Sequence, residues 1–236
     1  MNLIIGGSSG LGSSLANYFA EDGKTIIVSR KNTKDTKENI VHIGLDINTG
    51  NLDYLYDKIK ENELSNIFFT VGLIDWKNDD IFLDAKKFDE IFQTNFLSIK
   101  KIISELIKKR KLNSNCLICF CSSISTILPR HRQITYCAAK SALNSFYKSL
   151  RTYLYIHGYK YRVANLILGY MNTEMNKNIS LPLKKESPDK IANYIFKNRE
   201  NLSGTYYIPR YWILIKMIIN FIPEKILVRI IKILNL

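Results

Sequence analysis

Tyr136 and Lys140, in the segment Tyr-Cys-Ala-Ala-Lys, have the residue types and the spacing that proton-transfer chemistry needs. Four residues apart on a helix, they lie on one face about one turn from each other. An ammonium group near a phenol favours the phenolate and lowers the tyrosine pKa, which makes the phenol usable as an acid and a base near neutral pH. Ser122 and Ser123 precede Tyr136 by 14 and 13 residues. A serine hydroxyl and a phenol can polarise one carbonyl oxygen together.

A glycine-rich loop near the N-terminus indicates a nucleotide cofactor, with a turn that binds no ligand as the alternative. The loop follows a short apolar run, Asn2–Ile5, and opens a helical pattern. Glycine allows the backbone to approach a pyrophosphate, whose charge the free N–H groups of a helix N-terminus stabilise. The loop residues expected at the cofactor are Gly6, Ser8, Ser9, Gly10, Leu11 and Gly12.

The residues after the second predicted strand distinguish the two nicotinamide cofactors. NAD is usually met by an acidic side chain there, whereas this chain has Arg30 and Lys31. Both cations can accept a 2′-phosphate, and no neighbouring carboxylate is expected to repel it, so NADP(H) is favoured over NAD(H). The alternative is a solvated basic loop. Asp46 and Ile47, after the third strand, are placed to meet the adenine, although a plain turn aspartate explains Asp46 nearly as well.

The elements that must position these residues alternate between strand and helix. Apolar runs predict strands at 2–5, 25–28, 40–44, 66–71, 116–121, 162–168 and 206–208. Helical patterns cover 12–22, 52–61, 88–109 and 136–157, and a serine before a proline starts another near 187–189. This alternation predicts an α/β fold, a Rossmann-type doubly wound parallel sheet of about seven strands flanked by helices. We expect residues 1–210 to form this domain.

The composition is that of a folded protein with one large domain. The chain has 236 residues, of which 46% are hydrophobic and 23% charged. Its net charge of +13 suits nucleic acid, an anionic membrane or a phosphorylated substrate, or reflects codon bias alone. Nucleic acid is the least favoured, because aromatic and basic residues do not alternate on a predicted strand. The chain opens on a strand without a signal-peptide pattern, so a cytoplasmic location is expected.

Cysteine and histidine do not form a metal-binding pattern in the sequence. Cys116 and Cys119 share one predicted strand and point to opposite faces, which is poor geometry for zinc. They are expected to be buried and reduced. His42, His131 and His157 are scattered, and none is placed to serve a hydrolase triad. We therefore expect no metal.

Several of these residues, taken in order, resemble the short-chain dehydrogenase/reductase superfamily in its single-domain form. The matching positions are Gly6, Gly10, Gly12, Asn95, Ser123, Tyr136 and Lys140. The resemblance extends through Gly169 and Thr173 and covers about residues 1–210. It implies transfer of the pro-S hydride between a nicotinamide and a carbonyl or alcohol carbon.

The resemblance also implies a role for each matching residue. Tyr136 is the general acid in reduction and the base in oxidation. Lys140 lowers the pKa of Tyr136 and holds the ribose hydroxyls. Ser123, rather than Ser122, binds the substrate oxygen, and Asn95 holds a water in a relay behind Lys140. The remaining expected cofactor contacts are Gly72, Gly169 and Thr173, the last of which would meet the nicotinamide carboxamide.

The chain departs from the family pattern in three places. Ile5 replaces a threonine, and Leu168 replaces a proline before Gly169. Phe-Thr-Val-Gly at 69–72 replaces Asn-Asn-Ala-Gly, so the hydrogen bonds of that asparagine pair are expected to be absent. This segment supports an alternative function, a non-catalytic nucleotide-binding regulatory or scaffold protein on the same fold. The retained Asn95 and Tyr136 argue against it.

Two further segments bear on the substrate and its location. Arg130, His131 and Arg132 lie between the serine and the tyrosine, where they can bind an anionic substrate group or form a solvated loop. Residues 211–236 predict an amphipathic, basic helical extension that Pro223 divides in two. Its longest apolar run, 211–215, is far below the roughly 20 residues that span a bilayer.

The extension leaves three interpretations open: it lies in the interface at the inner face of a membrane, it contacts a partner subunit, or it forms a lid over the substrate. The sequence therefore predicts an NADPH-dependent oxidoreductase that reduces a ketone or oxidises a secondary alcohol. The extension favours a lipid or lipid-linked sugar as substrate. The family's habit implies a dimer or tetramer built on the helices that hold Asn95 and Tyr136.

Overall fold

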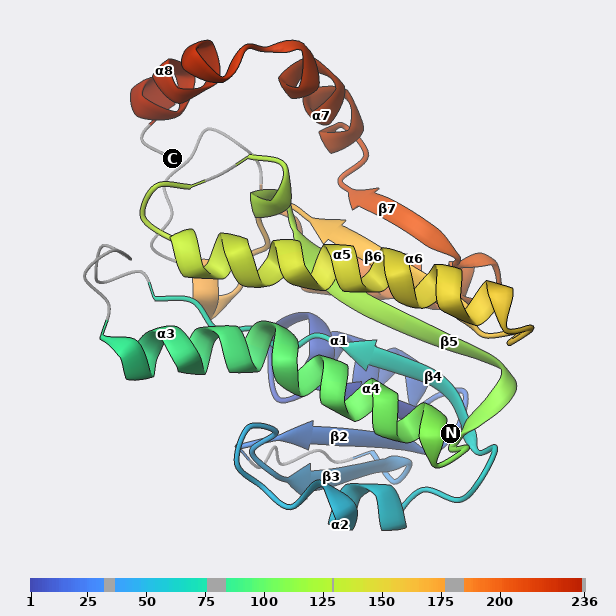
Figure 1. Ribbon diagram of the computed structural model, residues 1–236. Coiled ribbons are helices and arrows are strands. Elements are labelled where there is room, and N and C mark those ends of the chain that lie inside the picture. The colour runs from blue at the N-terminus through green and yellow to red at the C-terminus, as the bar shows by residue number, and fades with distance from the viewer. Residues whose placement is uncertain (32–36, 76–83, 129, 177–184, 235–236) are drawn as a thin grey trace.

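A seven-stranded parallel sheet with helices on both faces forms the body of the molecule in the computed structural model (Figure 1), which describes residues 1–31, 37–75, 84–128, 130–176 and 185–234. The strand order is β3-β2-β1-β4-β5-β6-β7. The strands are β1 (Asn2–Ile5), β2 (Thr25–Ser29), β3 (Ile40–Gly44), β4 (Leu64–Phe69), β5 (Leu112–Ser123), β6 (Arg162–Leu168) and β7 (Gly204–Ile208). The predicted doubly wound sheet is confirmed. Its order reverses between β1 and β4, and such switch points are where ligands bind in these folds.

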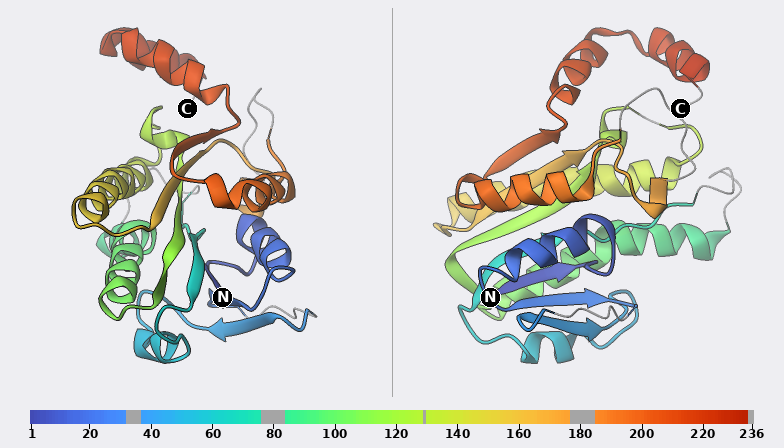
Figure 2. Two further views of the ribbon diagram at one scale, coloured as in Figure 1. Left: turned by 90° about the vertical axis from the view of Figure 1, so that its right-hand side faces the viewer. Right: turned by 180° about the vertical axis from the view of Figure 1, so that it is seen from behind.

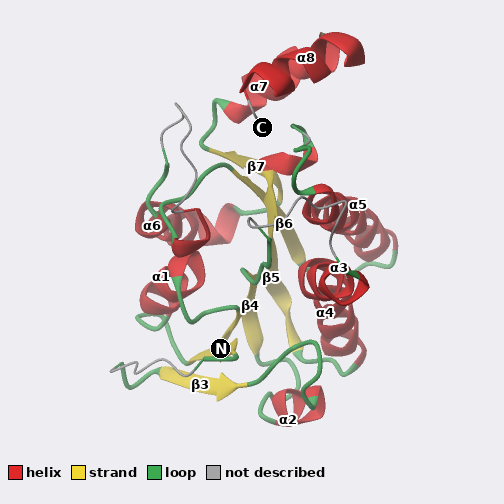
Figure 3. Ribbon diagram, turned by 90° about the vertical axis from the view of Figure 1, so that its left-hand side faces the viewer, coloured by secondary structure: helices red, strands yellow, loops and turns green. Residues whose placement is uncertain are grey.

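Alternating side chains of the strands build two core layers. Ile4, Ile27 and Phe68 pack against α1 (Gly10–Phe19) and α6 (Pro188–Asn198). Leu3 and Ile5 point the other way, into the layer that contains α2 (Leu52–Asp57), α4 (Ser98–Lys108) and α5 (Ile134–Ile156). The two groups of helices lie on opposite faces of the sheet in Figures 2 and 3.

The cysteines of β5 follow the same alternation. Cys116 belongs to the layer of α4 and α5, whereas Cys119 and Cys121 belong to the layer of α1 and α6. All three are buried. They serve as small apolar side chains, and burial raises the pKa of each thiol.

Two predicted helices differ from the structure. The helix predicted over 52–61 ends at Asp57. Beyond this point Ile59 turns into the core, and its carbonyl accepts a hydrogen bond from Lys111 Nζ at 2.5 Å. The helix predicted over 88–109 consists of α3 (Ala85–Phe92), a π-helical turn at Gln93–Leu97 and α4.

The C-terminal extension forms two helices that follow β7 and stand beyond the edge of the sheet (Figure 1). They are α7 (Trp212–Phe221) and α8 (Glu224–Leu234), with Pro223 between them as predicted. Trp212 anchors the start of α7, because its side chain is buried against Ile124, Ile167 and Tyr170. Within the described ranges, neither these helices nor any other combine the length and apolar character needed to cross a bilayer.

Candidate active site

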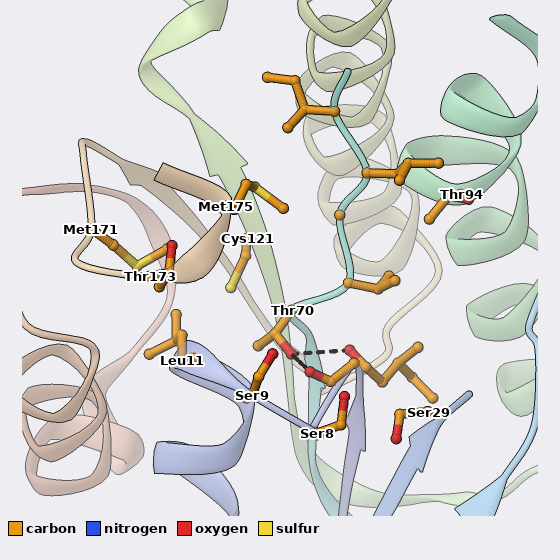
Figure 4. Close-up of a pocket in the computed structure, with 18 of the residues that line it drawn as sticks. Ser8, Ser9, Leu11, Ser29, Thr70, Thr94, Cys121, Met171, Thr173 and Met175 are labelled. Carbon is orange, nitrogen blue, oxygen red and sulfur yellow. Dashed lines mark hydrogen bonds between the residues drawn. The ribbon is translucent and has the colours of Figure 1, made fainter. Parts of the chain in front are cut away.

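A cavity of about 660 Å³ lies where the carboxyl ends of β1, β2, β4, β5 and β6 meet. Every cofactor-binding residue predicted from the sequence lines it, as does Ser123. Asn95 hydrogen-bonds the backbone of Leu73, which lines the cavity. In Figure 4, Leu11 at the start of α1 lies beside Thr173 and Met171 from the segment after β6, and Ser9 from the glycine loop lies beside Thr70.

The glycine loop can form only with glycine at its key positions. Gly6 and Gly10 have φ values of +97° and +55°, in the region that side chains with a Cβ rarely adopt. A Cβ on Gly12 would lie 2.3 Å from the carbonyl oxygen of Gly6 and 2.6 Å from Thr70 Oγ1. The loop therefore packs closely against the end of β4, and the N-terminus of α1 opens into the cavity.

Thr70 compensates for one of the departures from the family pattern. Its hydroxyl lies 3.0 Å from the carbonyl oxygen of Ile5 and 3.2 Å from that of Gly6, and Figure 4 draws both contacts. The hydroxyl can donate its proton to either acceptor. Thr70 therefore connects the end of β4 to the glycine loop by hydrogen bonds of its own.

Ser123, Tyr136 and Lys140 come together at the end of β5. The Tyr136 side chain hydrogen-bonds with that of Ser123, whose Oγ also accepts from the Ser125 N–H at 3.2 Å. Lys140 Nζ donates to the carbonyl of Cys121 at 3.0 Å and lies 5.8 Å from the centre of the Tyr136 ring. The Ser122 hydroxyl, by contrast, is buried without a hydrogen-bond partner among the described residues.

The protonation of this group differs from the prediction. Burial raises the pKa of Tyr136 above 10.0, against the hydrogen bond from Ser123 and the charge of Arg130, which lower it. Burial also lowers the pKa of Lys140 from 10.5 to about 8. The charge of Arg130 thus favours the phenolate in this structure, and the effect expected of Lys140 stays a prediction. At neutral pH the phenol is protonated, as a proton donor must be.

Asn95 is held in place by the π-helical turn. Its Nδ2 donates to the carbonyls of Leu73 at 2.7 Å and Ile91 at 2.8 Å, and its Oδ1 accepts from the Leu73 N–H at 3.1 Å. A Cβ on Gly72 would lie 3.4 Å from Asn95 Oδ1 and 3.8 Å from Lys140 Nζ. Both distances are ordinary van der Waals contacts, so position 72 lies close to both Asn95 and Lys140.

The far end of the cavity contains the cofactor-selecting residues. Arg30, Lys31, Asp46 and Ile47 all line it. The expectation that no carboxylate lies near Arg30 was wrong, because Glu90 of α3 lies 3.9 Å away. Both side chains are exposed, and such pairs contribute only about 0–1 kcal/mol, so a phosphate can replace Glu90.

Asp46 has a structural role in addition to its place at the cavity. Its Oδ1 accepts from the Asn48 N–H at 2.8 Å and shapes the turn after β3. Asn48 in turn hydrogen-bonds Thr94 at 2.7 Å and Ser98 at 2.9 Å. Asp46 is therefore a turn aspartate, as the alternative interpretation expected. Through Asn48, the turn that it shapes is joined to the helix that bears Asn95.

Some residues of the cavity were not predicted from the sequence, and one was predicted only as one of several candidates. Tyr170, Met171 and Met175 follow β6 and give this side of the cavity an aromatic and thioether lining. A segment after a strand without a family motif gives no signal of its own. Thr94 was detectable as the neighbour of Asn95. Arg130 was one of three candidates, and the structure places it in the cavity.

Among curated proteins, the chain is similar to a 2,5-dichloro-2,5-cyclohexadiene-1,4-diol dehydrogenase of Sphingobium indicum, with 26% identity over 209 residues and 80% of each chain covered. Among solved structures, it is similar to a short chain dehydrogenase of Burkholderia cenocepacia in complex with NADP, with a TM-score of 0.78, 17% identity, and 97% and 95% of the two chains covered. It is also similar to a 3-oxoacyl-[acyl-carrier protein] reductase of Brucella melitensis in complex with NAD, with a TM-score of 0.75, 15% identity, and 89% and 96% covered.

A family profile described as short chain dehydrogenase matches residues 1–184, which include the glycine loop and Ser123, Tyr136 and Lys140. The neighbouring structures share the fold, and between them they bind both nicotinamide cofactors. The chain therefore belongs to the short-chain dehydrogenase family and is an NAD(P)-dependent oxidoreductase.

Proposed function

We propose that the protein is an NADPH-dependent oxidoreductase that reduces a ketone to a secondary alcohol. The observation that carries this proposal is the convergence of Ser123, Tyr136 and Lys140 on the cavity that the glycine loop also lines. NADPH would supply the hydride. The Ser123 hydroxyl and the Tyr136 phenol would bind the carbonyl oxygen, and Tyr136 would protonate it as negative charge develops. Lys140 and Asn95 would return the proton from solvent.

The test replaces Tyr136 by Phe and measures NADPH oxidation with ketolipids, ketosugars and simple diketones. Removing the proton donor should lower kcat by at least about 100-fold and leave NADPH binding nearly intact. The matched control is Tyr155→Phe, on an exposed face of the same helix. Turnover by Tyr136→Phe at the parent rate would refute the assignment. Cofactor binding without turnover of any ketone by the parent would favour the regulatory or scaffold alternative.

The preference for NADP(H) rests on Arg30 and Lys31 at the adenine end of the cavity. A guanidinium can bind a phosphate through two parallel hydrogen bonds, each stronger than a neutral one. Arg30→Ala should therefore weaken NADPH binding by roughly 10- to 100-fold, because a hydrogen bond to a charged group contributes about 1.5–3 kcal/mol. NADH binding should change little. The exposed Lys24 gives the control variant Lys24→Ala. Equal losses for both cofactors would overturn the preference.

We also propose that residues 211–236 dock on an anionic membrane surface, which would bring a lipid or lipid-linked sugar ketone within reach. Large apolar side chains of α7 are exposed along one face, and Phe221 has 86% of its surface accessible. The other exposed apolar residues of this face are Leu214, Met217 and Ile218. On α8, Lys225, Arg229 and Lys232 are exposed four and three residues apart, so they form one basic stripe. Exposed apolar and basic faces together are typical of helices that lie in a membrane interface.

The membrane proposal is tested by sedimentation with vesicles of phosphatidylcholine alone or with anionic phosphatidylglycerol. The parent should bind the anionic vesicles, and Leu214→Glu combined with Phe221→Glu should abolish binding. Lys225→Glu combined with Arg229→Glu should make binding weaker and less dependent on salt. A parent that stays in the supernatant with both vesicles would contradict the proposal. An apparent mass that rises with protein concentration, and that Leu214→Glu combined with Phe221→Glu lowers, would instead identify a subunit contact through the extension.

A homo-oligomer is proposed from the outer faces of the helices that hold Asn95 and Tyr136. Leu97, Phe88 and Tyr153 are large apolar side chains exposed on these helices. Such exposed groups on packed helices are typical of subunit interfaces. Light scattering after gel filtration should give a dimer or tetramer, and Leu97→Glu should lower the mass. A monomeric parent at micromolar concentration would refute the proposal.

A further inference from the structure

The loop after β5 presents three cationic candidates in the sequence, and the structure separates them. His131 and Arg132 are exposed, whereas Arg130 is only 8% exposed. Arg130 lines the same cavity as Ser123, Tyr136 and Lys140. Its guanidinium carbon lies 4.9 Å from the centre of the Tyr170 ring, and Tyr170 lines the cavity as well. A buried cation therefore lines the cavity together with Ser123, Tyr136 and Lys140.

The position of Arg130 also has an electrostatic effect on its surroundings. Its charge lowers the pKa of both Tyr136 and Tyr170, against the rise that burial causes. The guanidinium of Arg130 lies over the face of the Tyr170 ring. The N–H donors of a guanidinium lie in its own plane, where their geometry suits a carboxylate or a phosphate.

We propose that Arg130 binds an anionic group, carboxylate or phosphate, that the substrate carries close to its reacting carbonyl. This proposal rests on the proposed reductase function and makes its substrate an anionic ketone. The carbonyl oxygen lies at Ser123 and Tyr136, the anionic group pairs with Arg130, and the remainder of the substrate lies against Met171 and Met175. Arg130 is thus a residue that determines specificity, in addition to its effect on Tyr136.

The first test compares matched anionic and neutral ketones. Acetoacetate is paired with methyl acetoacetate, and dihydroxyacetone phosphate with dihydroxyacetone. The parent should prefer the anionic member of one pair by at least about tenfold in kcat/KM, since a charged hydrogen bond contributes about 1.5–3 kcal/mol. The pair that shows the preference identifies carboxylate or phosphate as the group. Preference for neither anion overturns the proposal.

Variants of Arg130 then separate substrate binding from an effect on Tyr136 alone. Arg130→Met should lower kcat/KM for the preferred anion by about 10- to 100-fold, and for its neutral partner by less than about threefold. Equal losses for both partners overturn the proposal, because they would show that Arg130 acts only through Tyr136. The exposed Arg132 gives the control Arg132→Met, which should match the parent. Arg130→Lys keeps the charge and should retain part of the preference, so it tests the proposal even where Arg130→Met does not fold.

A binding experiment makes the result independent of turnover. The Tyr136→Phe protein saturated with NADPH is titrated calorimetrically with acetoacetate and with dihydroxyacetone phosphate. One of the two should bind, and Arg130→Met in the same background should weaken its binding by about 10- to 100-fold. Failure of both anions to bind overturns the Arg130 proposal. If the parent nevertheless reduces neutral ketones, the proposed reductase function stands, whereas absence of turnover with every ketone would count against that function.

Discussion

Replacing Lys140 by Met should stabilise the cofactor-free protein at neutral pH while it abolishes activity. Lys140 is buried, and burial lowers its pKa from 10.5 to about 8. Between these values the unfolded chain binds a proton that the native protein does not, so stability rises with pH through this window. Below about pH 8 the native protein contains a buried ammonium group, and its stability is lowest. The methionine side chain carries no charge, so the substitution should remove this cost.

The magnitude follows from the two pKa values. At pH 7 the unfolded chain binds the proton of Lys140 more tightly than the native protein does, which corresponds to a destabilisation of roughly 3 kcal/mol. At pH 9.5 the same calculation gives roughly 1 kcal/mol. The change in unfolding free energy caused by the substitution should therefore differ by about 2 kcal/mol between the two pH values. The hydrogen bond lost from Nζ to the Cys121 carbonyl and the altered packing contribute at both and largely cancel.

The assay is urea unfolding of the parent and Lys140→Met, freed of cofactor, at pH 7 and pH 9.5. The exposed Lys148 on the same helix gives the control Lys148→Met, whose effect should not depend on pH. A pH-independent difference between the parent and Lys140→Met would refute the reasoning. It would show that Lys140 stays neutral, or that its charge is solvated in the native protein.

Two further substitutions address the packing around the site. Thr70→Val should cost about 1 kcal/mol of unfolding free energy and weaken NADPH binding several-fold, because it removes the hydroxyl that can donate to the carbonyl of Ile5 or Gly6. Thr70→Ser keeps the hydroxyl and should restore both quantities, as measured by urea unfolding and by cofactor titration. If Thr70→Ser loses as much as Thr70→Val, the hydroxyl does not have this role. Gly169→Ala should cost about 1–3 kcal/mol, because its Cβ would lie 2.4 Å from Trp212 Nε1. The displaced indole of Trp212 should make the fluorescence of the Gly169→Ala variant red-shifted. This shift should be absent when Trp212→Phe is combined with Gly169→Ala. An unchanged spectrum and an unchanged stability of Gly169→Ala would show that the site accommodates a methyl group.

Local patterns in the sequence were sufficient to predict the fold and the main grouping of the site. Gly12 and Tyr136 are far apart in the chain, but each lies in the first turn of the helix that follows a strand, Gly12 after β1 and Tyr136 after β5. In a parallel sheet the carboxyl ends of the strands share one edge, so residues from several strands must meet there. Register along each strand then fixes which side chains face which layer, as Cys116 and Cys119 show. These relations depend on short-range spacing, which a single sequence contains.

The parts that could not be predicted depend on which helix packs beside which loop. Glu90 reaches Arg30 across 60 residues of sequence, and Thr70 reaches Ile5 across 65. Asn95 in the π-helical turn likewise hydrogen-bonds Leu73, 22 residues away in the sequence. No spacing rule links such partners, because their distance is set by packing between layers. The separation of Arg130 from its exposed neighbours has the same origin.

The C-terminal extension and the substrate side of the cavity share a continuous set of contacts. Trp212 at the start of α7 is packed against Tyr170, and Tyr170 carries the guanidinium of Arg130 on its ring. Gly169 has no room for a Cβ because the Trp212 indole occupies that space. Since both aromatic side chains are buried, a shift of α7 that moved Trp212 would open a void beside Tyr170, and the ring would have to follow it or lose packing energy. We therefore expect any partner that binds α7 and α8 to influence the position of Arg130, and through it the choice of substrate.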